Sequence, residues 1–337
     1  MVERIPEAAA RLALRRLMAA YLAVAGSVLL FPGRPSGWPI LLLLHLGGIV
    51  LLLEAGPARL LTRPMAARWP RITAAASDWY PLLIMPFLYL ELGALNVAVH
   101  GGRYFDGTVM GWEEMLFRSQ PSQEWASALP NTALSEALHF FYLSYYFIIY
   151  LPPLYLWLRG WGGGREPASL SNPAAASVSS LSGRGGFLAA HQHMLFTLML
   201  VFLGHYLVFI FFPVQGPRYL FPPPGGELSQ GFMYHLAHAI LERGSSQGTA
   251  FPSSHVGVAF AQTALVFLFL RRAAPLILVS SVGLALGAIY GGFHYAVDVL
   301  GGLVLGLLLF VAAPRVAGVL GRGRPAPEPS PATSAHP

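Results

Sequence analysis

Residues 187–212 read FLAAHQHMLFTLMLVFLGHYLVFIFF, a run of 26 residues that contains no Asp, Glu, Lys or Arg. About 20 apolar residues are enough for an α-helix to cross the hydrocarbon core of a bilayer. The stretch therefore predicts a membrane-spanning helix. The whole chain of 337 residues is 55% hydrophobic and 11% charged, with a mean hydropathy of +0.56, whereas a soluble domain has roughly 25% charged residues. This composition argues against a soluble domain, a collagen and a disordered chain.

Seven further apolar stretches are long enough for membrane helices, so the sequence predicts an all-α, polytopic integral membrane protein with about eight transmembrane helices. These stretches cover residues 17–31, 38–53, 79–99, 139–158, 254–270, 274–291 and 294–313. A short interfacial helix is expected over residues 231–243. The tail 317–337 has too few apolar side chains to pack and is expected to be a disordered cytoplasmic segment.

The arginines, which are the only basic residues besides histidine, are divided unequally between the two sides of the membrane. Sixteen of the 21 lie in one set of loops, and the other set holds five. Basic residues near helix ends tend to stay in the cytoplasm, so both termini are predicted to be cytoplasmic. No basic patch is formed, which argues against nucleic acid as a partner. The Arg-, Ala-, Gly- and Pro-rich composition favours a bacterial inner membrane.

Three short polar motifs follow or open the predicted helices in the second half of the chain. They are GPR at 216–218, PSSH at 252–255 and HYAVD at 294–298. Alternation of the helices places all three at the outer, periplasmic face of the membrane. Together they supply two His, one Asp, one Arg and two Ser, which is the composition of a phosphoryl-transfer site. With no Cys in the chain, thiolate chemistry is excluded.

The first two motifs contain groups that can hold a phosphoryl group. The guanidinium of Arg218 matches the equatorial oxygens with a rigid fork of donors. Ser253 and Ser254 lie where a helix begins, so their hydroxyls and backbone amides are expected to face the same oxygens.

The histidines are assigned two different tasks. His294 and Asp298 are four residues apart on one helical face, where the carboxylate can accept the Nδ1 proton and leave Nε2 as a nucleophile. His255 is the expected general acid for the departing alkoxide and then the base for the incoming water or alcohol.

The stretches FPVQGPRY, FPSSHV and YGGFHYAVDVLGG resemble the type 2 phosphatidic acid phosphatase superfamily. DWYP, YLELGALN and YLSYY further resemble its subgroup of inositol phosphorylceramide synthases. The resemblance covers about 77–313 and implies a six-helix catalytic core at 77–316, preceded by a two-helix membrane extension at 1–76 and followed by the tail at 317–337.

The resemblance implies transfer of a phosphoryl group from a lipid phosphate through a phosphohistidine on His294, without metal or cofactor. The sequence departs from the family pattern at two places. A Lys usual in the first motif is replaced by Phe211, and an Arg usual in the third motif is replaced by Ala288, or by Gly292 in the synthase-like subgroup. Gly292 is therefore expected to let a backbone amide approach the phosphate instead.

Three functions are compatible with the motifs. Hydrolysis of a lipid phosphate or diphosphate is the leading hypothesis, and transfer of a phospho-head-group to an alcohol is the alternative. A noncatalytic lipid-binding or scaffold protein is the third, because the second Arg is missing. No sequence feature sets an oligomeric state. Among the other polar residues, Glu91 and His205 are interpreted as interhelical contacts, and a metal site at His235, His238 and Glu242 is a minor alternative.

Overall fold

The computed structural model describes residues 4–54, 68–161 and 184–322. In these ranges the chain forms 13 α-helices and one short 3₁₀ helix, and the only β-type pairing is an isolated bridge between Val214 and Thr249. The all-α class expected from the sequence is confirmed. The helices are α1 (Glu7–Val28), α2 (Trp38–Glu54), α4 (Pro70–His100), α5 (Asp106–Phe117), α6 (Pro121–Ala128), α7 (Thr132–Leu143), α8 (Tyr145–Trp161), α9 (Arg184–Phe211), α10 (Pro217–Leu220), η3 (Gly226–Gln230), α11 (Phe232–Gly244), α12 (Ser254–Phe269), α13 (Ala274–Tyr290) and α14 (Ala296–Leu320).

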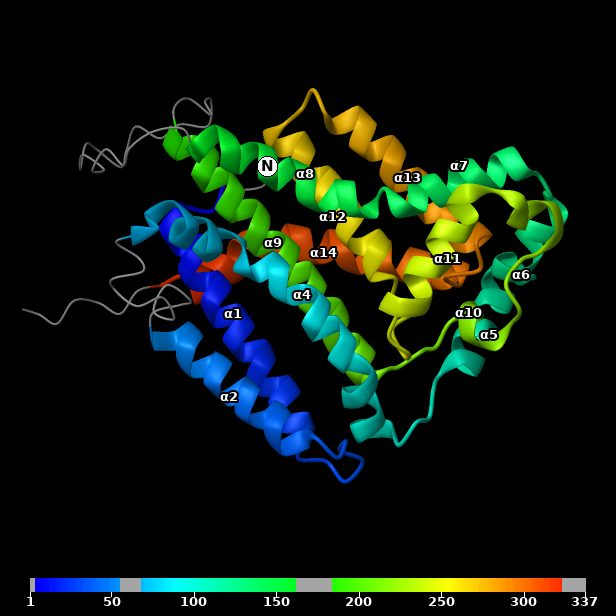
Figure 1. Cartoon of the computed structure of the whole chain (residues 1–337), viewed down its shortest axis with the longest axis horizontal. Coiled ribbons are helices and arrows are strands. Elements are labelled where there is room, and N and C mark those ends of the chain that lie inside the picture. Colours follow the sequence, from blue (N-terminus) through cyan, green and yellow to red (C-terminus); the bar gives the residue numbers. More distant parts are fainter. Residues whose placement is uncertain (1–3, 55–67, 162–183, 323–337) are drawn as a thin grey trace, which may run out of the picture.

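Helix α9 lies at the centre of the bundle (Figure 1). It is apolar on all sides, and such a helix is stable where neighbours or lipid cover it completely. Helices α1, α4, α8, α12 and α14 pack against it. In the most apolar 18-residue stretch of α9, 78% is buried, whereas the corresponding share is 39% in α4 and in α14. This long uncharged run is therefore the core of the fold, and α4 and α14 are more exposed on their outer faces.

Three of the described helices are long and apolar enough to cross a membrane, namely Ile72–His100, Gly185–Phe211 and Ala296–Leu320. Helices α7 and α8 together form a fourth candidate span, broken by a bend of 40°. Helices α2, α12 and α13 are apolar but have only 16 or 17 residues. Large apolar side chains such as Leu43, Phe87 and Leu308 are exposed on the outer surface, which suits contact with lipid. The chain is a helical membrane protein.

Each of the eight predicted apolar stretches overlaps a helix. Several differ in detail. Helix α1 begins at Glu7 rather than at Leu17, because Arg11 within it is paired with Glu7 and with Asp78 of α4. The fourth stretch is interrupted at Ser144, between α7 and α8. Helix α14 continues to Leu320, so the first residues of the predicted tail are helical, and residues 323–337 lie outside the described ranges.

A polar network holds one end of the bundle together, where α1, α4, α8 and α9 meet. The Nη1 atom of Arg11 lies 2.6 Å from Oδ1 of Asp78. Trp157 Nε1 donates to Oδ2 of the same carboxylate at 3.0 Å, and Gln192 Nε2 donates to Oδ1 at 3.1 Å. Both carboxylate oxygens of Asp78 therefore have donors. We call this set the inner network: Arg11, Asp78, Trp157 and Gln192.

Two further polar residues of the long helices, Glu91 and His205, make contacts between or within helices. Glu91 of α4 lies with Oε1 3.4 Å from Nε2 of His45 in α2. His205 of α9 has Nδ1 2.7 Å from the carbonyl oxygen of Val201 in its own helix. A Cβ placed on Gly257 of α12 would come within 2.4 Å of His205 Nε2, so the imidazole packs directly on α12.

Short helices cover the opposite end of the bundle. Figure 1 shows α5, α6, α10 and α11 there, and α5 packs on α14, α6 on α13 and α11 on α7. The predicted interfacial helix 231–243 corresponds closely to α11. Helices α5 and α6 were not expected, because neither carries a long apolar run. All three sequence motifs lie at this end, which we call the outer end of the bundle.

Candidate active site

The first motif lies in the turn that follows α9. This helix ends at Phe211, and Pro213 comes directly after the break. Gly216 has a φ of +89°, and a Cβ on it would come within 2.8 Å of the Ala250 Cβ. Only glycine adopts this conformation without strain. The turn therefore delivers Arg218 on α10, directly beside the segment that precedes α12.

Arg218 lines a cavity of about 330 Å³ together with Gly292 and His238. Its Nη1 atom is buried and has no hydrogen-bond partner among the described residues. A buried donor without a partner costs free energy, and a planar guanidinium suits phosphate oxygens. Arg218 is therefore free to bind an anion in this cavity. Other lining residues include Ser122, Gln123, Ser127 and the prolines at 222–224.

The second motif opens α12. Ser253 is its N-cap, with Oγ accepting the Val256 N–H at 3.5 Å. The Ser253 N–H donates to the carbonyl oxygen of Asp298 at 2.9 Å, so this amide does not face a phosphate as expected. The N–H groups of Ser254 and His255 precede the first intrahelical bond, which Gly257 donates to Ser253. The helix leaves these two amides available.

The third motif begins in a tight loop between α13 and α14. The carbonyl oxygen of Ala288 accepts the N–H groups of both Phe293 and His294, each at 3.0 Å. Gly292 has a φ of +66°, and its N–H donates to Ile289 at 3.0 Å. Gly292 therefore shapes the turn and lines the cavity, but its amide is already bonded. The expectation that this amide binds phosphate does not fit the geometry.

His294 is buried, and the carbonyl group of Ala250 orients its ring. The Nδ1 atom lies 3.1 Å from the Ala250 oxygen and 3.5 Å from Oδ2 of Asp298. A carbonyl oxygen only accepts, so Nδ1 carries the hydrogen and Nε2 keeps its lone pair. Asp298 lies beside the ring, but its short hydrogen bond is to the Tyr295 N–H, at 2.8 Å. Its Oδ1 is buried without a partner among the described residues.

His255 faces His294, with ring centroids 5.6 Å apart. Two aromatic rings enclose His255, Tyr145 at 4.4 Å and Tyr142 at 5.4 Å between centroids. Its Nδ1 atom is buried and unpartnered within the described part of the chain. Two histidines from different motifs thus form a pair.

The predicted residues therefore form two neighbouring groups. His255, His294, Asp298 and Ser253 come together in a buried cluster, and Arg218 and Gly292 line the cavity. The two histidines are not among the lining residues, and the loop 291–295 connects the two groups. Within the described ranges no three His, Asp or Glu side chains are placed to hold a metal ion, so the alternative site at His235, His238 and Glu242 is not formed there.

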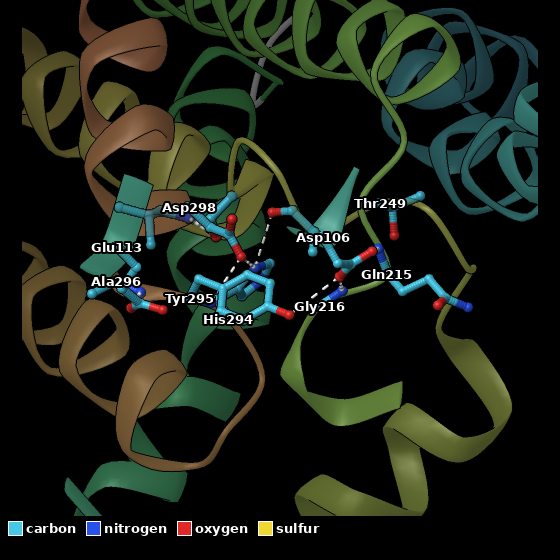
Figure 2. A network of polar contacts seen from close by, with 12 residues as sticks. Asp106, Glu113, Gln215, Gly216, Thr249, His294, Tyr295, Ala296 and Asp298 are labelled. Carbon is cyan, nitrogen blue, oxygen red and sulfur yellow. Dashed lines mark hydrogen bonds and ion pairs between the residues drawn. The ribbon is translucent and has the colours of Figure 1, made fainter. Parts of the chain in front are cut away.

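Two carboxylates that the sequence did not assign to the site belong to it, both on α5 (Figure 2). Asp106 accepts the N–H groups of Gln215 and Gly216, at 3.0 and 2.8 Å. Glu113 accepts the Ala296 N–H at 2.7 Å. No spacing links these residues to the motifs. The only signal was the presence of three carboxylates within the otherwise mostly apolar stretch 105–117.

Glu113 is fully buried, and its Oε2 atom has no partner among the described residues. Burial raises the pKa of this carboxyl from 4.5 to about 7, and the nearby Asp298 acts in the same direction, while the bond from Ala296 opposes the shift. A carboxyl with such a pKa is largely protonated in mildly acidic solution and loses its proton near neutrality.

An all-helical membrane fold with a buried histidine pair beside an arginine-lined cavity defines a candidate phosphoryl-transfer site. Residues 187–312 match the family model described as PAP2 superfamily. This segment includes Arg218, Ser253, His255, His294 and Asp298, and the match supports the resemblance to that superfamily. It suggests a phosphatase-type or phosphotransferase-type lipid enzyme. No curated protein and no solved structure matches the chain.

Proposed function

We propose that this protein is an integral-membrane lipid phosphatase that needs no metal ion and acts through a phosphohistidine on His294. The observation that carries the proposal is the contact between His294 Nδ1 and the Ala250 carbonyl oxygen, at 3.1 Å. It holds the imidazole in the tautomer whose Nε2 is nucleophilic. His255, 5.6 Å away between ring centroids, is close enough to act on the same phosphoryl group.

The reaction has two halves. In the first, Nε2 of His294 forms a bond to phosphorus while the bond from phosphorus to the lipid oxygen breaks. Protonated His255 gives its proton to the departing alkoxide, which leaves as the lipid alcohol. In the second, neutral His255 removes a proton from water as the water oxygen attacks phosphorus. Inorganic phosphate leaves, and both histidines return to their starting states.

We assign two sets of donors to the charge on the phosphoryl oxygens, and Asp298 to the charge on the histidine ring. Arg218 supplies the guanidinium with the unpartnered Nη1. Ser254 and His255 supply first-turn amides at the positive end of α12. The carboxylate of Asp298 lies 3.5 Å from Nδ1 of His294 and stabilises the positive charge that the ring acquires when it is phosphorylated. In this proposal the two first-turn amides take the place of the Lys and second Arg that the family pattern contains.

The site is proposed to face the periplasm in a bacterial inner membrane, with both termini in the cytoplasm. The unequal distribution of arginine, 16 against five, supports this orientation, because basic loops tend to remain on the cytoplasmic side. The substrate is then a phosphate-bearing lipid of the outer leaflet, whose head group reaches the cavity beside Arg218.

A second candidate function is transfer of the phosphoryl or phospho-head-group to an alcohol, as in the synthase-like subgroup. The observation that favours it is the cavity, whose volume of about 330 Å³ leaves room beyond a phosphate group. Ser122, Gln123 and Ser127 give that extra space hydrogen-bonding side chains. In this reaction a hydroxyl of the acceptor replaces water in the second half.

One experiment separates the candidates. Purified protein in detergent is incubated with EDTA and dioctanoyl phosphatidic acid, a polyprenyl diphosphate or a ceramide phosphate, with and without inositol or glycerol. Phosphate release that persists in EDTA and disappears in His294→Ala supports the phosphatase. A new head-group lipid formed only with added alcohol supports the transferase. Equal inactivity of both proteins on every lipid contradicts both and favours a noncatalytic lipid-binding or scaffold protein.

A further inference from the structure

Helix α5 lies outside the segment that matches the PAP2 superfamily, yet it contacts both halves of the candidate site. Asp106, its first residue, accepts the N–H groups of Gln215 and Gly216 with its two oxygens, at 3.0 and 2.8 Å. Oδ1 also accepts the Tyr295 hydroxyl at 3.3 Å. One buried carboxylate therefore ties the loop before Arg218 to the residue after His294 (Figure 2).

Glu113 provides a second connection two turns further along α5. Its Oε1 accepts the N–H of Ala296 at 2.7 Å. This N–H belongs to the first turn of α14, which has no intrahelical partner for it. Asp298 accepts the neighbouring Tyr295 N–H at 2.8 Å. Side chains from two helices thus accept the free N–H groups at the start of α14. These bonds fix the start of the helix directly after His294.

We propose that Asp106 and Glu113 are positioning residues that set Arg218 against His294 for phosphoryl transfer, an inference that rests on the proposed function. Neither carboxylate contacts the reacting atoms. Arg218 and His294 come from separate loops, 215–218 and 291–295. Among the described residues, Asp106 hydrogen-bonds to both the segment before Arg218 and the residue after His294.

The contribution of Asp106 is expected to be large because phosphoryl transfer depends on alignment. A misplacement of about 1 Å costs an enzyme on the order of 100-fold in rate. Asp106→Asn keeps the size of the side chain but replaces one acceptor oxygen with an NH₂ group. That NH₂ group would face a backbone N–H. Because both are donors, one of the two hydrogen bonds to the loop before Arg218 is lost.

A double-mutant cycle tests this inference with dioctanoyl phosphatidic acid as substrate. Asp106→Asn should lower kcat/KM by about 100-fold in the wild-type background and by less than about threefold in Arg218→Ala, because a guanidinium that is absent cannot be misplaced. Glu114→Gln is the matched control, since Glu114 is an exposed carboxylate on the same helix. It should leave kcat/KM unchanged. Equal losses in both backgrounds would show a merely structural role and overturn the inference.

A second measurement does not depend on activity. The chain contains no cysteine, so Leu220→Cys, at an exposed position at the end of α10, can be labelled with a trifluoromethyl reagent. The fluorine NMR line should shift or broaden in Asp106→Asn and not in Glu114→Gln. If wild type hydrolyses no lipid but the line still responds, the positioning role stands and the proposed function fails. An unchanged line in Asp106→Asn contradicts the positioning role.

Discussion

Two sets of buried polar groups, the inner network and the motif residues of the outer end, differ in how they are paired. In the inner network, Arg11, Trp157 and Gln192 donate to both oxygens of Asp78. At the outer end, one atom each of Arg218, His255 and Asp298 is buried without a partner in the described part of the chain. A buried polar group without a partner lowers stability. The inner network therefore holds helices together, whereas the outer groups are kept for a ligand.

The largest expected effect follows from removing the nucleophile at the outer end. His294→Ala should lower the rate of phosphate release from dioctanoyl phosphatidic acid by at least about 1,000-fold, since the proposed nucleophile is lost. His235→Ala, an exposed histidine on α11, is the matched control and should remain active. If the activity of His294→Ala is within about tenfold of wild type, His294 is not the nucleophile that forms a covalent intermediate.

The next effect concerns the shape of the cation at the outer end. Arg218→Lys keeps the charge but loses the planar fork, so kcat/KM should fall by on the order of 100-fold. Steady-state kinetics on the same lipid measure it. Arg243→Lys, at an exposed position on α11, should have no effect. A fully active Arg218→Lys enzyme would show that the guanidinium is not used for phosphate binding.

A substitution in the inner network should lower the stability of the protein and leave its activity nearly unchanged. Asp78→Asn breaks the contact with Arg11, and since that arginine is partly exposed, the expected loss is about 1–3 kcal/mol in the free energy of unfolding. Thermal denaturation in detergent should show a lower Tm, with kcat of the folded protein within about threefold of wild type. A large loss of kcat at unchanged Tm would contradict the division between the two ends.

The smallest effect is a change in pH dependence at Glu113. Burial raises the pKa of this carboxyl to about 7 from 4.5. Between these values the unfolded chain releases a proton that the folded chain keeps, so the free energy of unfolding decreases as pH rises from about 4.5 to 7. Glu113→Gln removes the titrating group and should flatten the Tm profile in this window. An unchanged slope would mean that Glu113 does not titrate there.

Most of the fold could be predicted because apolar runs of bilayer length leave little choice of secondary structure. The run at 187–212 became the central helix, and the all-α class followed. The break at Ser144 and the early start of α1 could not be predicted. The break at Ser144 depends on local packing. The early start of α1 depends on the pair between Arg11 and Asp78, two residues that are far apart in sequence.

The sequence predicted the motif residues of the site better than the groups that position them. Spacing predicted that His294 and Asp298 share one helical face, but His294 lies in the loop before Tyr295, the N-cap of α14. The loop places Nδ1 of His294 3.5 Å from Oδ2 of Asp298. The sequence could not show that the Ser253 and Gly292 amides are used within the protein. Nor could it find Asp106, because its contacts are with backbone groups about 110 residues away, which leave no pattern in side-chain spacing.

The most direct test of the central claim is to look for the phosphoryl group on the protein. Wild type is mixed with phosphatidic acid carrying radiolabelled phosphate, quenched in alkali during the first turnover, and digested for mass spectrometry. An acid-labile phosphoryl group is expected on the peptide that contains His294, and none in His294→Ala. Label on another residue, or hydrolysis by wild type that leaves no label on this peptide, would contradict the central claim.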